Sequence, residues 1–217
     1  MQEEEIVRIL KNYVTEMRCD KLETILAQRT RYLTVLLEDI FQPQNASAVL
    51  RTCDCFGVQD VHIIETFNPY QINPMVVKGA DKWLTLHKHT GYAEAVSQLR
   101  TNGYRIVATS LREDSKPLHE LDLSKGKCAI VFGNEHRGVS DELLNEADEH
   151  VQIQMYGFTQ SLNISVSAGI ALHYLTGELK KSGINLSLSE TEKAVLQAQW
   201  LQQSVKKSEL ILHRFIK

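Results

Sequence analysis

Val131-Phe132-Gly133-Asn134-Glu135-His136-Arg137-Gly138 is one of three separated stretches that decide how this chain is expected to fold. The other two are Asn45-Ala46-Ser47-Ala48-Val49-Leu50-Arg51, and Ile153-Gln154-Met155 running into Ser161-Leu162-Asn163-Ile164-Ser165. Each follows or ends a short apolar run that predicts a buried strand. Because strand-like and helix-like runs alternate, the sequence predicts an α/β fold with a parallel sheet.

The predicted elements follow from local patterns around these stretches. Strands are expected at residues 33–37, 61–64, 104–109, 128–132 and 151–155. Apolar residues at helical spacing predict helices at 46–56, 92–99, 140–145 and 162–174, and Gly57 is a suitable stop for the first of them. Residues 66–88 contain two prolines and predict only a loop with a short helix.

Both ends of the chain read as helical extensions. Residues 3–28 carry an amphipathic pattern, and Ser189 with Glu192 forms a capping-box pattern ahead of a final amphipathic helix. We therefore expect a helical RNA-binding extension at 1–31, a central domain at 32–180 and a C-terminal extension at 181–217. Residues 180–187 are the expected hinge.

Composition limits the class of protein. With 217 residues, 43% of them hydrophobic, the chain can bury the core of one α/β domain. No apolar leader or membrane-length run is present, so a cytoplasmic protein without a membrane partner is expected. The four cysteines lie at spacings that suit neither a disulfide framework nor a zinc site, and no metal is expected.

Charge argues in two directions about nucleic acid. The formal net charge of -3 is mildly unfavourable for an RNA-binding protein, because phosphate contacts need clustered cations. A cluster does occur near the N-terminus, where we expect phosphate contacts from Arg18, Lys21, Arg29 and Arg31. Ordinary solvated charges on a helix explain these residues equally well.

Two polar residues of the first stretch, Asn45 and Arg51, are candidates for different roles. Asn45 stands where the N-cap of the following helix is expected. Arg51 lies off the apolar stripe of that helix, so it faces solvent or a site. In the second stretch, the Gly133–Gly138 turn lacks the Lys-Ser/Thr ending of a P-loop, which argues against nucleoside triphosphate binding.

The third stretch carries two further polar candidates. Ser161 is expected to be the N-cap of the buried helix at 162–174. Asn163 would then lie in the first turn of an apolar helix, where an amide without a partner is costly. It should therefore be bonded to something specific.

In order and spacing, the three stretches resemble the motifs of the SpoU/TrmH branch of the SPOUT RNA methyltransferases. This resemblance implies a deep trefoil knot, a fold that periodicity alone would not predict. It also implies a catalytic group formed by Arg51, Asn45, Glu135, Ser161 and Asn163. S-adenosyl-L-methionine is the implied cofactor, with contacts from Thr109, Gly133, Ile153, Met155, Ser161 and Leu162.

The resemblance implies a homodimer that methylates a ribose 2′-OH of RNA, with guanosine 18 in the D-loop of tRNA as the expected target. Arg51 would either accept the hydroxyl proton, aided by an RNA phosphate, or stabilise the developing alkoxide electrostatically. Ribosomal RNA or another tRNA position remains an alternative substrate, and a catalytically silent RNA-binding module is a second alternative. A Rossmann nucleotide enzyme is disfavoured, because no Gly-x-Gly-x-x-Gly opens a helix.

Overall fold

The computed structural model describes residues 2–215, which belong to two compact units. The sheet unit comprises Arg31–Leu186, and the helical unit comprises Met1–Thr30 with Ser187–Lys217. The second boundary falls inside the segment 180–187, which the sequence predicts as a hinge. Within the described residues, no helix is long and apolar enough to cross a bilayer.

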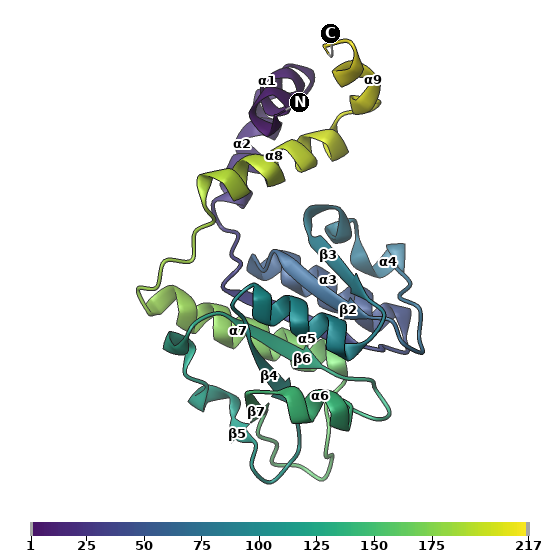
Figure 1. The fold of residues 1–217 in the computed structure, drawn as a ribbon, viewed down its shortest axis with the longest axis vertical. Coiled ribbons are helices and arrows are strands. Elements are labelled where there is room, and N and C mark those ends of the chain that lie inside the picture. Colours follow the sequence, from purple (N-terminus) through teal and green to yellow (C-terminus); the bar gives the residue numbers. More distant parts are fainter. Residues whose placement is uncertain (1, 216–217) are drawn as a thin grey trace. The chain divides into compact units, whose positions relative to one another are not determined.

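The sheet unit is built on a seven-stranded, all-parallel sheet of order β3-β2-β1-β6-β4-β7-β5 (Figure 1). Its strands are β1 (Leu33–Glu38), β2 (Asp60–Ile64), β3 (Thr85–His89), β4 (Arg105–Thr109), β5 (Lys116–Pro117), β6 (Cys128–Phe132) and β7 (Glu149–Gln152). Its helices are α3 (Pro43–Phe56), α4 (Pro74–Val77), α5 (Tyr92–Thr101), α6 (Asp141–Glu146) and α7 (Ile164–Lys181), with 3-10 turns at Ala80–Trp83, Leu118–Glu120 and Leu123–Lys125. The predicted parallel α/β fold is confirmed.

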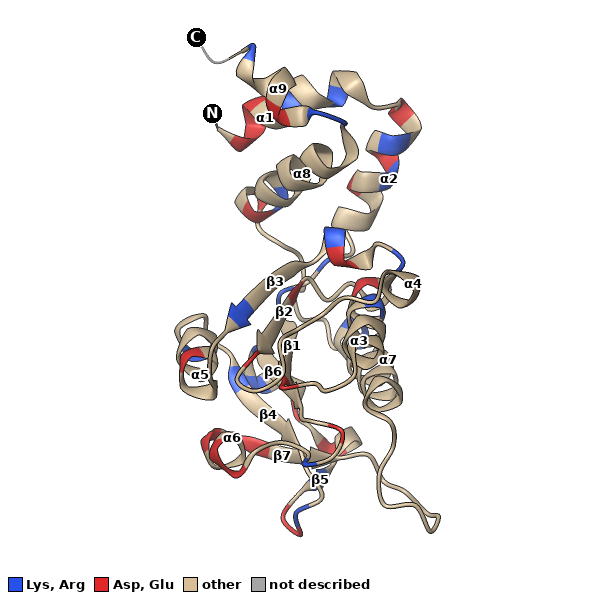
Figure 2. Ribbon diagram, turned by 90° about the vertical axis from the view of Figure 1, so that its right-hand side faces the viewer, with Lys and Arg blue, Asp and Glu red and all other residues tan. Residues whose placement is uncertain are grey.

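Helices cover both faces of this sheet, which explains why its central strands are apolar on both sides. Val35 and Leu37 of β1 face the core shared with α3 and α7, whereas Leu36 faces the core shared with α5 and α6. Figure 2 shows the two helix pairs on opposite sides of the sheet. All six residues of β1 are buried as a result.

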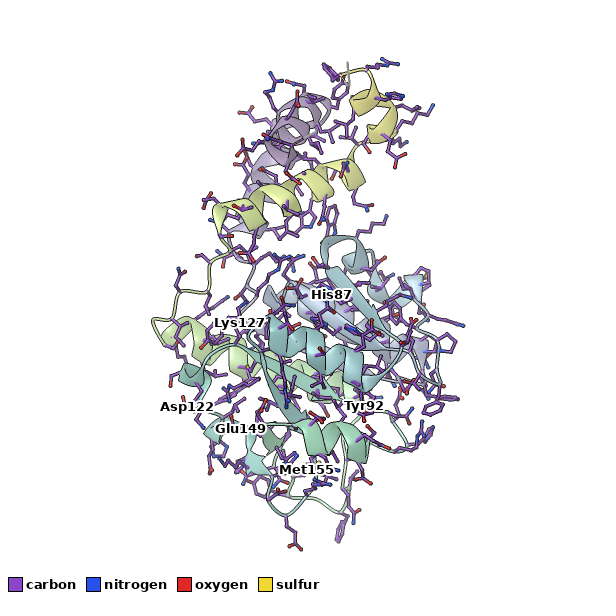
Figure 3. All side chains as sticks on the ribbon, in the orientation of Figure 1. His87, Tyr92, Asp122, Lys127, Glu149 and Met155 are labelled. Carbon is purple, nitrogen blue, oxygen red and sulfur yellow. The ribbon has the colours of Figure 1, made fainter. Side chains whose placement is uncertain are left out.

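Several element boundaries differ from the prediction. β7 spans Glu149–Gln152, so Met155 does not end a strand. Met155, which is labelled in Figure 3, lies in the loop that follows β7. The strand stops there because Gln152 is the last residue paired with the short edge strand β5. The prediction of Ser161 as an N-cap is wrong, because α7 begins at Ile164 and is capped by Asn163.

The segment without a clear prediction, residues 66–88, contains α4 and the start of the edge strand β3. The adjacent His89 is buried, and its Nε2 lies 3.0 Å from Nδ1 of His62 on β2. Desolvation lowers the pKa of His62 to about 3, so this imidazole is neutral at ordinary pH. Among the described residues, no group of three His, Cys, Asp or Glu is placed to hold a metal ion.

The helical unit contains α1 (Glu3–Leu10), α2 (Glu16–Leu26), α8 (Glu190–Ser204) and α9 (Ser208–His213), with a 3-10 turn at Lys11–Tyr13. The amphipathic region predicted at 3–28 is therefore two helices, since Thr15 is extended and caps the second one. The capping box of Ser189 and Glu192 is confirmed at the start of α8. Trp200 and Leu201 of α8 contribute to the buried side chains of this unit.

Candidate functional site

Loops at the carboxyl edge of the sheet line an open cavity of about 820 Å³. They follow β4, β6 and β7, which are neighbours in the sheet, and ligands of open α/β sheets bind at this edge. The cavity is lined by all six predicted cofactor residues, namely Thr109, Gly133, Ile153, Met155, Ser161 and Leu162. Asn45, Glu135 and Asn163 also line it, so the structure brings the three sequence stretches together around one space.

A continuous chain of hydrogen bonds joins those three stretches. The Asn45 Nδ2 donates to Oε1 of Glu135 at 2.8 Å, and the Asn163 Nδ2 donates to Oδ1 of Asn45 at 3.2 Å. The Asn163 Oδ1 then accepts from the backbone N–H of Ser165 at 2.9 Å and from its hydroxyl at 2.6 Å. The expectation that Asn163 has a specific partner is confirmed. Each amide is oriented by a neighbour, so the network is fixed before any ligand binds.

Asn45 is not the helix cap that the sequence suggests. The N-cap of α3 is Gln42, and Asn45 lies within the first turn of the helix with only 6% of its surface exposed. Pro43 at the first helical position starts the helix earlier than the apolar pattern does, because its fixed φ suits that position. The buried side chain is thereby released from capping and reaches across to Glu135.

Glu135 lies at the N-terminal end of α3. Its carboxylate accepts the backbone N–H of Phe41 at 2.9 Å and that of Gln42 at 3.2 Å, in addition to the Asn45 amide. Burial raises the pKa of Glu135, but the hydrogen bonds from Asn45, Phe41 and Gln42 outweigh it, and the net pKa is lowered. The helix dipole also favours an anion at this position. Glu135 is therefore an ionised anchor for the loop and for Asn45.

This lowered pKa makes a prediction about pH. A carboxyl group with a depressed folded pKa stabilises the fold above its unfolded pKa, near 4.5, and this contribution is lost as the pH falls through the folded pKa. We expect Glu135→Gln to be less stable than the parent at neutral pH, with the difference shrinking below about pH 4.5. Thermal unfolding from pH 7 to pH 3 measures it. Glu113→Gln, an exposed carboxylate, is the control, and a pH-independent difference would contradict the assignment.

The turn that carries Glu135 needs its first glycine for its own packing. A Cβ on Gly133 would lie 2.1 Å from the carbonyl carbon of Gly138 and 2.1 Å from the nitrogen of Val139. The turn closes with reciprocal backbone hydrogen bonds between Asn134 and Gly138 at 2.9 and 2.8 Å. The close approach at Gly133 is thus made by the chain's own backbone.

Arg51 is not brought to the cavity. It is exposed on α3, and among the described residues the cavity is lined by Asn45 of that helix but not by Arg51. Its predicted position off the apolar stripe is confirmed. Ser161 is exposed in the loop between β7 and α7 and does line the cavity.

The four predicted RNA contacts are in different environments. Lys21 is exposed on α2, and the partly exposed Arg18 donates to the hydroxyl of Ser204 at 3.3 Å. Arg29 is only 2% exposed, with its guanidinium 5.3 Å from the Trp200 ring centre, so it packs inside the helical unit rather than facing a phosphate. In the sheet unit, Arg31 pairs with Asp60 at 2.8 Å. Figure 2 shows acidic residues interspersed with basic ones along α1 and α2.

The structure adds site residues that sequence reasoning did not find. Arg112 and Arg137 both line the cavity, and so does Gln42. Arg112 follows β4, which was a usable signal, because polar residues just after parallel strands face this edge. The sequence assigns no role to His136 and Arg137, because the loop of the resembling family varies at these two positions.

Residues 32–173 match the SpoU rRNA Methylase family. The tRNA (guanosine(18)-2′-O)-methyltransferase of Borreliella burgdorferi is 43% identical over 94% of both chains. The crystal structure of the A. aeolicus TrmH/SpoU tRNA modifying enzyme is similar with a TM-score of 0.80 and 33% identity, covering 88% of this chain and 98% of that one. The SpoU methyltransferase AviRb from Streptomyces viridochromogenes, solved with AdoMet, shares the fold at 20% identity and a TM-score of 0.59, over 74% of this chain and 62% of that one.

Proposed function

Because this chain belongs to the SpoU rRNA methylase family, we propose that it transfers a methyl group from S-adenosylmethionine to the ribose 2′-OH of guanosine 18 in tRNA. The observation that carries the proposal is the hydrogen-bond chain from Glu135 through Asn45 to Asn163 beside the cavity. The side-chain amides of Asn45 and Asn163 are both oriented beside the cavity, which is an arrangement expected of a binding or catalytic site. Because the hydrogen-bond network of Glu135, Asn45 and Asn163 is intact, a catalytically silent RNA-binding module is disfavoured.

The cavity fits the proposed cofactor. Its volume of about 820 Å³ lies within the range of small-molecule sites. Apolar side chains of Leu118, Ile153 and Leu162 suit an adenine ring, while the neighbouring turn at Gly133 presents backbone groups rather than a side chain. When bound there, S-adenosylmethionine supplies an electrophilic methyl group. The deep knot that the resemblance implies stays a prediction.

The chain's own residues then have distinct roles. Glu135 has both carboxylate oxygens occupied by N–H donors and a lowered pKa, so it is a poor base and serves to position Asn45. Arg51 lies outside the cavity of its own chain. In the complex with RNA it meets the ribose oxygen and a phosphate and stabilises the developing alkoxide, while the hydroxyl proton passes to that phosphate and on to water. Ser161, in the exposed loop at the cavity, contacts cofactor or ribose.

The test is to map 2′-O-methylation in tRNA transcripts incubated with the protein and the methyl donor. Methylation is expected at guanosine 18, and a transcript with 2′-deoxyguanosine at that position should accept none. Methylation of ribosomal RNA, or of another tRNA position, would replace the proposed substrate. Calorimetry without RNA should show binding of S-adenosylmethionine, and no binding would contradict the cofactor assignment.

We propose that the active form is a homodimer. Leu162, Val166 and Ile170 form an apolar stripe at helical spacing along α7 and the residues before it, with 38%, 48% and 42% of their surfaces exposed. We expect Val166→Glu with Ile170→Glu to give a monomer by light scattering, whereas the parent is a dimer. Leu210→Glu, at an exposed apolar position of α9, should leave the oligomeric state unchanged. A monomeric parent protein would contradict the proposal.

RNA contacts by the helical unit predict a measurable dependence on salt. We expect Arg18→Ala and Lys21→Ala each to weaken tRNA binding and to lower the slope of log affinity against log salt by about one unit. Fluorescence anisotropy between low and moderate salt measures this slope. Arg100→Ala, which removes a cation from α5, is the control. Unchanged slopes for Arg18 and Lys21 would place the RNA surface elsewhere.

A further inference from the structure

We propose that Phe41, Phe67, His136 and Arg137, here called the mouth cluster, hold an unstacked base of the RNA substrate. This inference rests on the proposed function and adds how the RNA is gripped next to the cavity. It commits to stacking of a base, rather than to contact with a paired helix or with another protein.

The cluster is a set of exposed flat groups that already contact one another in pairs. The rings of Phe41 and His136 meet edge to face with centroids 5.6 Å apart. The guanidinium of Arg137 lies 5.3 Å from the centre of the Phe67 ring. Phe41 is 56% exposed and Phe67 is 71% exposed, so each ring leaves most of its surface open. His136 and Arg137 also line the cavity, which places the cluster at its opening.

Backbone bonds to one residue hold the loops that carry these groups. Asp39, which is buried and has a φ of 47°, accepts the N–H of Phe67 at 2.8 Å through its carboxylate. Its backbone carbonyl accepts the side-chain amide of Asn134 at 2.7 Å, and Asn134 in turn accepts the N–H of His136 at 2.9 Å. Phe41 is fixed separately by its N–H bond to Glu135. Exposed rings on restrained backbone lose little freedom on binding, which favours a ligand at this place.

The chemistry of the cluster favours a nucleic-acid base over other occupants. Aromatic faces and a guanidinium plane are the groups on which unpaired bases stack. Arg137 and the nearby Arg112 supply positive charge for the phosphates on either side of such a base. A second copy of this chain has a different apolar surface available, the stripe of Leu162, Val166 and Ile170.

Single leucine substitutions test stacking, because leucine keeps apolar bulk but has no aromatic face. We expect Phe41→Leu and Phe67→Leu each to weaken tRNA binding about tenfold, with the affinity for S-adenosylmethionine unchanged. A tRNA carrying 2-aminopurine at the target nucleotide or at either neighbour should show quenched fluorescence on binding to the parent at one of these positions. That quenching should be reduced in both variants, and Phe67→Trp should restore it.

Three results would overturn the proposal. The first is that both leucine variants quench 2-aminopurine fluorescence as fully as the parent does. The second is that the parent quenches it at none of the three positions. The third is that the leucine variants change the oligomeric state and leave the RNA affinity unchanged. Arg100→Ala serves as a control for charge and should leave the quenching intact. Failure of the proposed function is distinguished by the methylation map of the parent protein, because binding and quenching are measured without the methyl donor and do not require methyl transfer.

Discussion

Replacing Arg51 with alanine is expected to lower methyl transfer by about two orders of magnitude or more, about 3 kcal/mol of transition-state stabilisation. The expected size is that of losing one donor to a developing oxyanion. Arg51 is exposed on α3 and lies outside the cofactor cavity, so its removal should cost little stability and leave S-adenosylmethionine binding intact. Arg51→Lys should fail nearly as badly, since an ammonium cannot hold a ribose oxygen and a phosphate with one planar fork.

Single-turnover assays with a radiolabelled methyl donor measure this effect separately from binding. Cys55→Ala is the matched control, because Cys55 is exposed on the same helix one turn further along. Near-parental rates for both Arg51 variants would make this residue an ordinary solvated charge. The proposed role of the arginine would then be wrong, although the cofactor site would be untouched.

The second large effect is expected from Gly133→Ala, which should abolish cofactor binding and lower the melting temperature. The added methyl group would lie 2.1 Å from backbone atoms of Gly138 and Val139, and backbone cannot move aside as the end of a flexible side chain can. The turn would have to open, which separates Asn134 from Gly138 and displaces Glu135. Glu135 would then no longer orient Asn45.

Calorimetric titration with S-adenosylmethionine and thermal unfolding test this prediction together. Gly91→Ala is the matched control, because a Cβ at Gly91 meets no atom within 4 Å and its φ of -171° is extended backbone. Cofactor affinity close to that of the parent in Gly133→Ala would show that the turn adapts. The network at Glu135 would then not depend on the closeness of the two backbone segments.

Local sequence patterns were sufficient to predict those helices and strands whose formation depends on neighbouring residues. The strand at 33–37, the helix that Gly57 ends and the capping box at Ser189 were predicted because periodicity and capping are set by neighbouring residues. The ends of helices and strands were predicted wrongly where residues distant in sequence determine them. β7 ends early because of its pairing with β5, and Asn163 rather than Ser161 caps α7 while also bonding to Asn45.

By itself, the sequence determined the α/β class, the family and the three stretches that form the site, since apolar periodicity and motif order are properties of the chain read in line. Only the tertiary structure decided which of those residues meet. Asn45 bonds to Glu135 across 90 residues of sequence, Arg29 is buried against Trp200, and Arg51 lies outside the cavity that Asn45 lines. The physical reason is that hydrogen bonds, burial and cavity walls depend on distances in space, and strand order brings together segments whose separation along the chain carries no such information.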